Sequence, residues 1–271
     1  MSPLWRDELG IYLGPHQLAL TRLARGVRPR PAGELLWSSP DGADGNWIAT
    51  LEALNGLLER REWQGAIASL VLSDHWVRYA IVPYSAALTG TTERIAHARH
   101  VLVGIYGEIV GEWSITLADA HPGVARAACA VPTTLLEELR TVLQRHSIPL
   151  KSLQPQLVAA YNHWRPRLPA SGAWFVSVEP GSLAAARLTP AGWDRVHSVR
   201  IGADWAVELR RLQTFGRLAA GCEQEGCVYV DAPPELRRSA AAAGADLHWL
   251  EEQVPDGSTA GRIEYFRRHS A

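Results

Sequence analysis

Hydrophobic and polar positions in the first part of the chain follow two different periods, which predicts a mixed α/β segment. Short apolar runs separated by glycine or proline predict three strands, at residues 9–13, 16–23 and 34–37. Large apolar side chains then recur at spacings of 4, 3 and 4 from Trp47 to Leu58, and this period predicts an amphipathic helix. Residues 66–72 are a nearly continuous apolar run, which is typical of a buried strand.

The same order of elements returns later in the chain. Apolar runs again predict three strands, at residues 174–178, 183–188 and 193–199. A helix is expected from Asp204, which is a good N-cap residue, with Trp205, Leu209, Leu212 and Phe215 as its apolar stripe. A strand, a helix and another strand are expected next, at residues 227–230, 234–243 and 247–250. The order strand-strand-strand-helix-strand therefore occurs twice.

Between the two repeats the pattern changes to helix, strand, strand, helix. One strongly amphipathic helix is predicted by the stripe Ile95, Ala98, Leu102, Ile105 and Ile109. Strands are expected at residues 113–117, 124–130 and 148–153. The spacing of Thr134 and Glu137 predicts a capping box at the start of the next helix. We expect residues 91–153 to form an inserted subdomain between a first lobe, residues 1–90, and a second lobe, residues 154–271.

Two apolar runs meet at Ser73-Asp74 within the stretch LVLSDHWVRYAIVPYSAAL, residues 70–88. This pattern predicts a hairpin of two buried strands. Side chains alternate between the faces of a strand, so three alternate residues are expected in the core: Val77, Tyr79 and Ile81. Trp76 and Arg78 would then share the opposite face.

Composition and charge exclude several classes of function. The formal net charge of −1 over 271 residues gives no electrostatic footprint for nucleic acid. No apolar run approaches the ~20 residues that cross a bilayer. The first residues, MSPLWRDELG, carry acids where a signal peptide is basic, which predicts a cytoplasmic chain. The three cysteines form neither a disulfide framework nor a zinc-ligand spacing, so no metal is expected.

The duplicated unit and its insert resemble the actin-like, ribonuclease-H-like fold of the FtsA and PilM branch. Residues 70–88, together with the stretch WFVSVEPG at residues 174–181, are similar to PilM-like and MshI-like pilus-assembly proteins. They also resemble the cytoplasmic domain of the GspL component of type II secretion. The resemblance implies a two-lobed fold with duplicated βββαβ units and an inserted small subdomain. It also implies an inner-membrane platform that grips the cytoplasmic tail of a membrane partner.

An ATP site in this fold needs two β-hairpin loops that embrace the phosphates. Each loop needs an acid for the metal and its waters, followed by a glycine that lets backbone N–H groups approach the anion. In the first hairpin, GIYLGPHQ, Gly14 is present, but Tyr12 stands at the acid position. Pro15 removes one N–H donor. We expect this loop to be a degenerate phosphate loop.

The second hairpin is altered as well. In VSVEPGS, Ser177 stands at the acid position and Glu179 at the glycine position, and Pro180 again removes a donor. Glu179 lies two residues from the lost acid, on the same face of a strand, but a carboxylate inside a phosphate loop repels the anion. Ala232-Pro233 replaces the glycine pair that admits adenine. We expect no bound cofactor and no ATP hydrolysis.

Two functions from different classes stay open. The first is a non-catalytic cytoplasmic platform for a type IV pilus or a type II secretion-like system, and the altered loops favour it. The alternative is an ATP-dependent enzyme of the actin-like fold, such as a small-molecule kinase. The platform would bind the cytoplasmic tail of an inner-membrane assembly protein, and through it lie at the inner membrane. Trp76 and Arg78 are candidate anchors for that tail, unless helices cover both faces of their strand and make Trp76 core. The sequence names neither the machine nor the oligomeric state, and a homodimer stays open.

Overall fold

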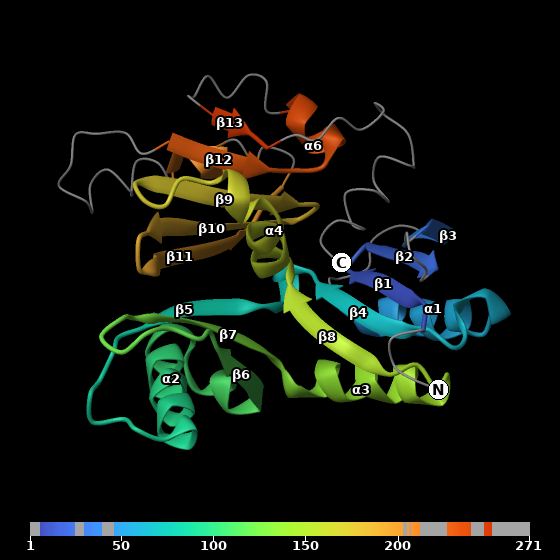
Figure 1. Cartoon of the computed structure of the whole chain (residues 1–271), viewed down its shortest axis with the longest axis horizontal. Helices are drawn as coiled ribbons and strands as arrows, with labels where there is room; N and C mark the ends of the chain where they lie inside the picture. Colours follow the sequence, from blue (N-terminus) through green and yellow to red (C-terminus); the bar gives the residue numbers. More distant parts are fainter. Residues whose placement is uncertain are drawn as a thin grey trace. The chain divides into compact units, whose positions relative to one another are not determined.

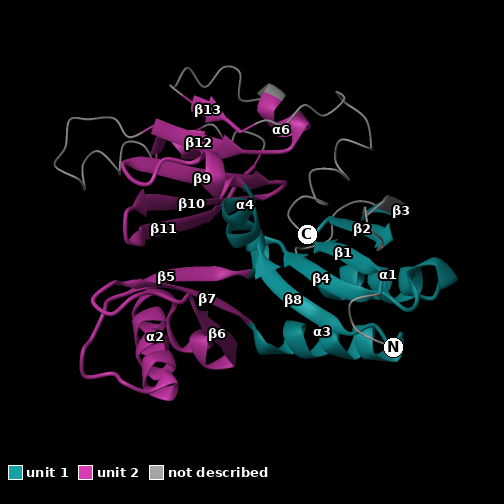
Figure 2. Cartoon of the chain, viewed as in Figure 1, with its two compact units in different colours: residues 1–76, 132–163, 254–271 teal, residues 77–131, 164–253 magenta. Residues whose placement is uncertain are grey.

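Two compact units make up the chain in the computed structural model (Figures 1 and 2). The structure describes residues 6–24, 30–39, 46–202, 205, 207–211, 227–239 and 247–250. The first unit takes its described residues from 1–76 and 132–163, and the second takes them from 77–131 and 164–253. Each unit is therefore assembled from segments that are far apart in the sequence.

A five-stranded sheet forms the first unit, with the strand order β3-β2-β1-β4-β8. Its strands are β1 (Glu8–Leu13), β2 (Gln17–Ala24), β3 (Arg30–Ser38), β4 (Ile67–Leu72) and β8 (Leu150–Pro155). Strand β2 pairs antiparallel with both β1 and β3, whereas β4 pairs parallel with both β1 and β8. The apolar runs of β1 and β4 are buried almost throughout, as central strands of a covered sheet require.

Helices of the first unit bury the predicted apolar stripes. They include α1 (Ile48–Leu58), η2 (Arg61–Trp63), η3 (Asp74–Trp76), α3 (Thr133–Arg145) and α4 (Gln156–Trp164). The buried residues of α1 and α3 are Thr50, Leu51, Leu54, Leu58, Leu135, Leu139, Val142 and Leu143. Two polar contacts join α1 and its N-cap to α3 and its C-cap. Trp47 Nε1 donates to Glu138 Oε2 over 3.0 Å, and His146 Nε2 lies 3.1 Å from Asn55 Oδ1.

The large sheet of the second unit repeats the topology of the first. Its strand order is β11-β10-β9-β12-β13. The strands are β9 (Ala173–Glu179), β10 (Ser182–Thr189), β11 (Gly192–Arg200), β12 (Cys227–Asp231) and β13 (Leu247–Trp249). Again three antiparallel strands are followed by two parallel ones. The predicted duplication is therefore confirmed, with β13 as the counterpart of β8.

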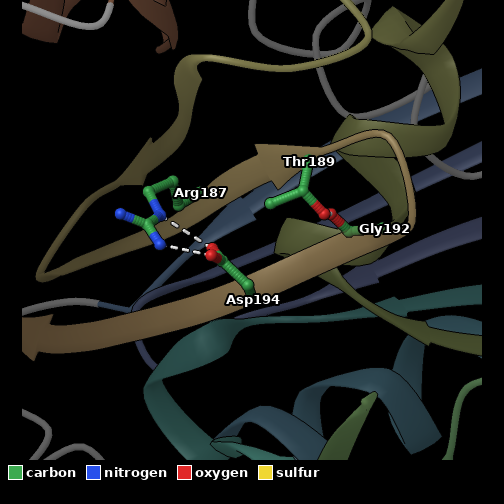
Figure 3. Close-up of polar contacts among 4 residues, drawn as sticks. All are labelled: Arg187, Thr189, Gly192 and Asp194. Atoms are coloured by element: carbon green, nitrogen blue, oxygen red, sulfur yellow. Dashed lines mark hydrogen bonds and ion pairs between the residues drawn. The ribbon is translucent and has the colours of Figure 1, made fainter. Parts of the chain in front are cut away.

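Apolar side chains on one face of this sheet form its core with Trp205 and Leu209, which are both helical. Helix α6 (Pro234–Ser239) and the short helix η5 (Arg165–Arg167) also belong to this unit. The expected N-cap Asp204 and the stripe residues Leu212 and Phe215 lie outside the described residues. Edge strand β11 is joined to β10 by Arg187 and Asp194, whose guanidinium and carboxylate form two parallel contacts (Figure 3). At the turn, Thr189 Oγ1 donates to the Gly192 carbonyl over 2.7 Å (Figure 3).

A three-stranded sheet with the order β5-β7-β6 forms the rest of the second unit. Its elements are β5 (Arg78–Val82), α2 (Thr91–Tyr106), η4 (Glu108–Glu112), β6 (Trp113–Leu117) and β7 (Arg126–Pro132). Helix α2 covers one face of this sheet, and Ala98 and Leu102 pack there against Ala80 and Val82 of β5. Edge strand β5 runs alongside β11 (Figure 1).

The hairpin expected over residues 70–88 does not form. Strand β4 pairs with β1 and β8 in the first unit, whereas β5 pairs with β7 in the second. Strands buried on both faces are apolar along their whole length, so their sequence does not indicate which neighbour they pair with. Ser73 and Asp74 do not form a hairpin turn, because β4 and β5 pair in different sheets. Asp74 begins η3, and its Oδ2 accepts a hydrogen bond from Leu157 N at the start of α4.

Three further expectations need correction. The expected insert, residues 91–153, includes α3 and β8, but β8 pairs with β4 and the segment 132–163 belongs to the first unit. The capping box at Thr134 is absent, because α3 begins at Thr133 after Pro132 and has no side-chain cap. The predicted stripe of α2 is buried only in its first part, since Ile105 and Ile109 are exposed where the helix ends.

Candidate functional site

The first hairpin loop joins β1 to β2 and is filled by an aromatic ring. Tyr12 is only 2% exposed and packs against Ala19, Val71 and Ala159. Its ring lies over Gly14 so closely that a Cβ atom on this glycine would lie 2.8 Å from the Tyr12 hydroxyl oxygen. A buried phenol ring therefore stands at the position where we expected a phosphate loop to need an acid.

The backbone of the first loop is also engaged within the protein. Gly14 N donates to the Gln17 carbonyl over 2.9 Å. The Gly14 carbonyl accepts a hydrogen bond from Thr50 Oγ1 at the start of α1, over 3.1 Å. Pro15 has no N–H group to offer. The N–H group of Gly14 is thus engaged in a hydrogen bond within the chain.

The second hairpin loop has become a tight turn. Glu179 and Ser182 pair across β9 and β10, so that Pro180 and Gly181 alone form the connection. Gly181 has a φ of +84°, and proline followed by a glycine of positive φ is the pattern of a type II turn. The Gly181 carbonyl accepts a hydrogen bond from Ile201 N over 3.1 Å. A turn this short leaves few N–H groups to surround a phosphate.

Buried polar side chains lie in the last residues of β9 and β12. Ser177, Glu179 and Asp231 are each 1% exposed. Ser177 and Asp231 are partners in the parallel register, and Glu179 lies two residues further along the strand, so the three side chains share one face of the sheet. The alternate residues Val176, Val178 and Val230 pack in the core on the other face. The ends of β9 and β12 thus place two buried carboxyl groups on the polar face of this sheet.

The segment expected to admit adenine is held by an arginine. Ala232 is fully buried, and its carbonyl accepts a hydrogen bond from Arg237 Nε over 2.6 Å. Arg237 Nη2 also donates to the Leu250 carbonyl over 3.1 Å. Ala232-Pro233 is thus fixed to α6 and to the end of β13. The sequence offered no signal for this contact, because its partners are backbone carbonyls.

The two candidate anchors of a partner tail lie in different environments. Trp76 is 5% exposed in η3, so its side chain is core and is not available as an exposed anchor. Arg78 begins β5 and is half-buried, and its Nη1 donates to the Val77 carbonyl over 2.9 Å. Burial lowers the pKa of Arg78, the nearby charge of Arg200 lowers it further, and Tyr106 acts in the opposite sense.

The expected division of the β5 faces was wrong in part. Val77 and Tyr79 are buried as predicted, but Ile81 is half-exposed. Ala80 and Val82, which alternate with Arg78, pack beneath α2. Both faces of the strand are therefore largely covered, and Arg78 is the polar residue at its beginning.

Comparison with solved structures shows similarity over most of the chain. A structure described as the PilM-PilN type IV pilus biogenesis complex matches with a TM-score of 0.66 at 16% identity, over 91% of this chain and 88% of that one. The cytoplasmic domain of EpsL, an inner membrane component of the type II secretion system of Vibrio cholerae, matches with a TM-score of 0.57 at 10% identity. That match covers 98% of this chain and 96% of the other.

A Bacteroides thetaiotaomicron protein of unknown function with an actin-like ATPase fold matches with a TM-score of 0.59 at 9% identity, over 92% of this chain and 94% of that one. No family model matches the sequence, and no curated protein matches it. The chain therefore has the actin-like fold, and the predicted resemblance to PilM-like and type II secretion proteins is confirmed at the level of the fold. In the described part of the chain, no helix has the length and apolar character needed to cross a bilayer.

Proposed function

We propose that this protein is a non-catalytic platform of a type IV pilus or type II secretion-like assembly system. The proposal is based on one observation above all: the two hairpin loops that we expect to hold phosphates in this fold offer few groups that could do so. Tyr12 fills the first loop, and a Pro180-Gly181 turn closes the second. The similarity of fold to PilM and to the EpsL cytoplasmic domain supports a role in assembly.

A thermal-shift measurement with Mg-ATP tests the non-catalytic part of the proposal. We expect Mg-ATP to raise the melting temperature no more than Mg²⁺ alone, because the loops offer few free N–H donors. A ligand present at 100 times its Kd stabilises a protein by about 2.7 kcal/mol, which is several degrees for a domain of this size. A shift of that size, or ATP turnover above a heat-inactivated control, would revive the kinase-like enzyme.

The platform would act by binding the short cytoplasmic tail of an inner-membrane assembly protein, and would lie at the cytoplasmic side of that membrane through this partner. Arg78 is the candidate contact in the second unit. It is half-buried in β5, which contacts β11, and Arg200 ends β11 close enough for its charge to act on Arg78. Two guanidinium groups near each other favour an acidic residue of a ligand, which neutralises their repulsion.

Co-purification with membrane proteins from the native cell would supply the tail for a binding measurement. Arg78→Glu should weaken binding of a peptide with the tail sequence and leave the melting temperature nearly unchanged. Arg140→Glu, at an exposed position of α3, is the matched control. Should Arg78→Glu unfold the protein, peptide binding is measured with Arg78→Gln, which removes the charge without reversing it. Normal binding by a folded Arg78 variant would place the tail site elsewhere.

A further inference from the structure

An exposed apolar surface lies where α2 ends and η4 begins. Ile105 is 57% exposed and Ile109 is 49% exposed, although both were expected to face the core. Contiguous exposed apolar patches mark interaction sites, and two isoleucines this exposed, four residues apart in sequence, make this surface a candidate. We call the surface formed by residues 104–112 the η4 patch.

The η4 patch is held in a fixed conformation by polar contacts from beneath. Arg99 Nη1 donates to the Val110 carbonyl over 2.6 Å, and its Nη2 donates to the Trp113 carbonyl over 3.3 Å. The Tyr106 ring packs edge-on against Trp113 at 5.6 Å, and its hydroxyl donates to the Tyr79 carbonyl over 3.0 Å. The two isoleucines therefore point outward from a braced segment.

Gly104 lies within α2, next to Ile105, and the fold does not explain it. A glycine inside a helix costs about 0.5–1 kcal/mol relative to alanine. A Cβ atom at Gly104 would meet no atom within 4 Å, and the same is true at Gly111. Packing within the described structure thus leaves room for side chains at both positions. Their absence keeps the surface beside the isoleucines open to the backbone of another molecule.

The exposed charged side chains of the patch are negative, whereas the guanidinium of Arg99 is part-buried and bound to carbonyls. Glu108 and Glu112 are both exposed on η4. The last turn of α2 has no basic residue, so the partial negative charge at this helix end adds to theirs. An anionic membrane surface would be repelled by these charges. A protein segment that alternates lysine or arginine with apolar residues complements them.

We propose that the η4 patch docks a basic, apolar segment of a protein partner. Apolar side chains of the segment would pack on Ile105 and Ile109, and its cations would lie near Glu108 and Glu112. This proposal does not depend on the role proposed for Arg78, and it stands if Arg78 binds nothing.

A photo-crosslinking experiment in the native cell tests the proposal. The photoreactive residue is introduced as Ile105→p-benzoylphenylalanine, with Ile48→p-benzoylphenylalanine as the control, since Ile48 is 50% exposed on α1. The attached segment is identified by mass spectrometry. We expect crosslinking at position 105 to a segment rich in lysine or arginine among apolar residues. An acidic segment, a lipid, a second copy of this chain, or no product beyond that at position 48 would overturn the proposal.

A synthetic peptide with the crosslinked sequence then tests the chemistry. Ile105→Ser, Gly104→Gln and Glu108→Lys should each weaken its binding about fivefold or more, and high salt should weaken it as well. The matched controls on α1 are Ile48→Ser, Gly56→Gln and Glu52→Lys, which should bind as wild type does. Gly104→Gln is the sharpest variant, because it should not destabilise the helix. Equal binding by all three patch variants would refute the proposal.

Discussion

The two five-stranded sheets have the same strand order, yet their first hairpin loops differ. In the first sheet three residues, 14–16, connect the strands, and a large side chain, Tyr12, packs beside them. In the second sheet Pro180-Gly181 alone connects the strands, and polar residues at the end of β9 are buried. The same strand topology therefore supports two different loop structures.

The largest expected effect on stability comes from removing the Tyr12 ring beside the first loop. Tyr12→Ala removes a buried ring packed on three elements, and such truncations cost about 3–5 kcal/mol of unfolding free energy. Urea unfolding of the variant measures the loss. We expect no gain of ATP binding, because Gly14 N still donates to Gln17. A loss of unfolding free energy below about 1 kcal/mol would mean that the ring contributes little to packing.

A smaller effect is expected in the second loop. Gly181→Ala forces a side chain into a φ of +84°, at a cost of about 1–2 kcal/mol. Gly56→Ala, in the middle of α1 with no atom within 4 Å of the new Cβ, is the control and should stabilise the protein slightly. Thermal unfolding of the two variants distinguishes an effect specific to the turn from a general effect of replacing glycine by alanine. Equal melting temperatures would show that the turn relaxes freely.

Ser177→Ala should have an effect of the opposite sign to Tyr12→Ala. Ser177 Oγ is buried and has no hydrogen-bond partner among the described residues. Removing an unsatisfied hydroxyl group is neutral or stabilises by up to about 1 kcal/mol. A clear loss of stability in chemical denaturation would show instead that the hydroxyl is bonded in solution, for example to water.

The smallest effect concerns the arginine–aspartate pair that each large sheet has. Arg22 contacts Asp7 in the first sheet, and Arg187 contacts Asp194 in the second (Figure 3). The hydrogen bond from Arg187 lowers the pKa of Asp194, so the pair stabilises the fold above the pKa of the unfolded chain. This stabilisation is lost as the pH falls through the lowered pKa.

Asp194→Asn should therefore cost about 0.2–1 kcal/mol at neutral pH, because the pair is partly exposed. The difference from wild type should disappear in strongly acidic buffer, where Asp194 of the wild type is protonated. Unfolding free energies at neutral and acidic pH measure it. A difference that persists at low pH would assign the effect to packing.

Much of the fold could be predicted from the sequence, because strand and helix periods are local. The duplicated unit, the buried stripe of α3 and the three-strand meanders were all read from spacing and turn residues. The partner of a strand is not local. The apolar runs of β4 and β5 are adjacent in sequence, but they pair in different sheets, and nothing in residues 70–88 indicates this.

For the candidate site, residue identities were informative and contacts were not. Tyr12, Pro15 and Pro180 could be recognised as poor residues for a phosphate loop. The hydrogen bond from Arg237 to the Ala232 carbonyl could not be predicted, because its acceptor is a backbone carbonyl. The cap that Asp74 provides for α4 could not be predicted, because it joins segments distant in sequence. The exposure of Ile105 could not be predicted, because periodicity indicates the apolar face of a helix but not how far the rest of the protein covers that face.

The small sheet has a consequence for how this chain could have diverged. The chain enters it through β5 and leaves through β7, and these strands pair antiparallel, with Arg78 opposite Ala130. The two points of attachment are thus neighbours, about 5 Å apart as strand partners are. A segment attached at neighbouring points can be exchanged, enlarged or removed during evolution without stretching the rest of the chain. Residues 77–131 also have an apolar core of their own, so this segment could change while both large sheets keep their architecture.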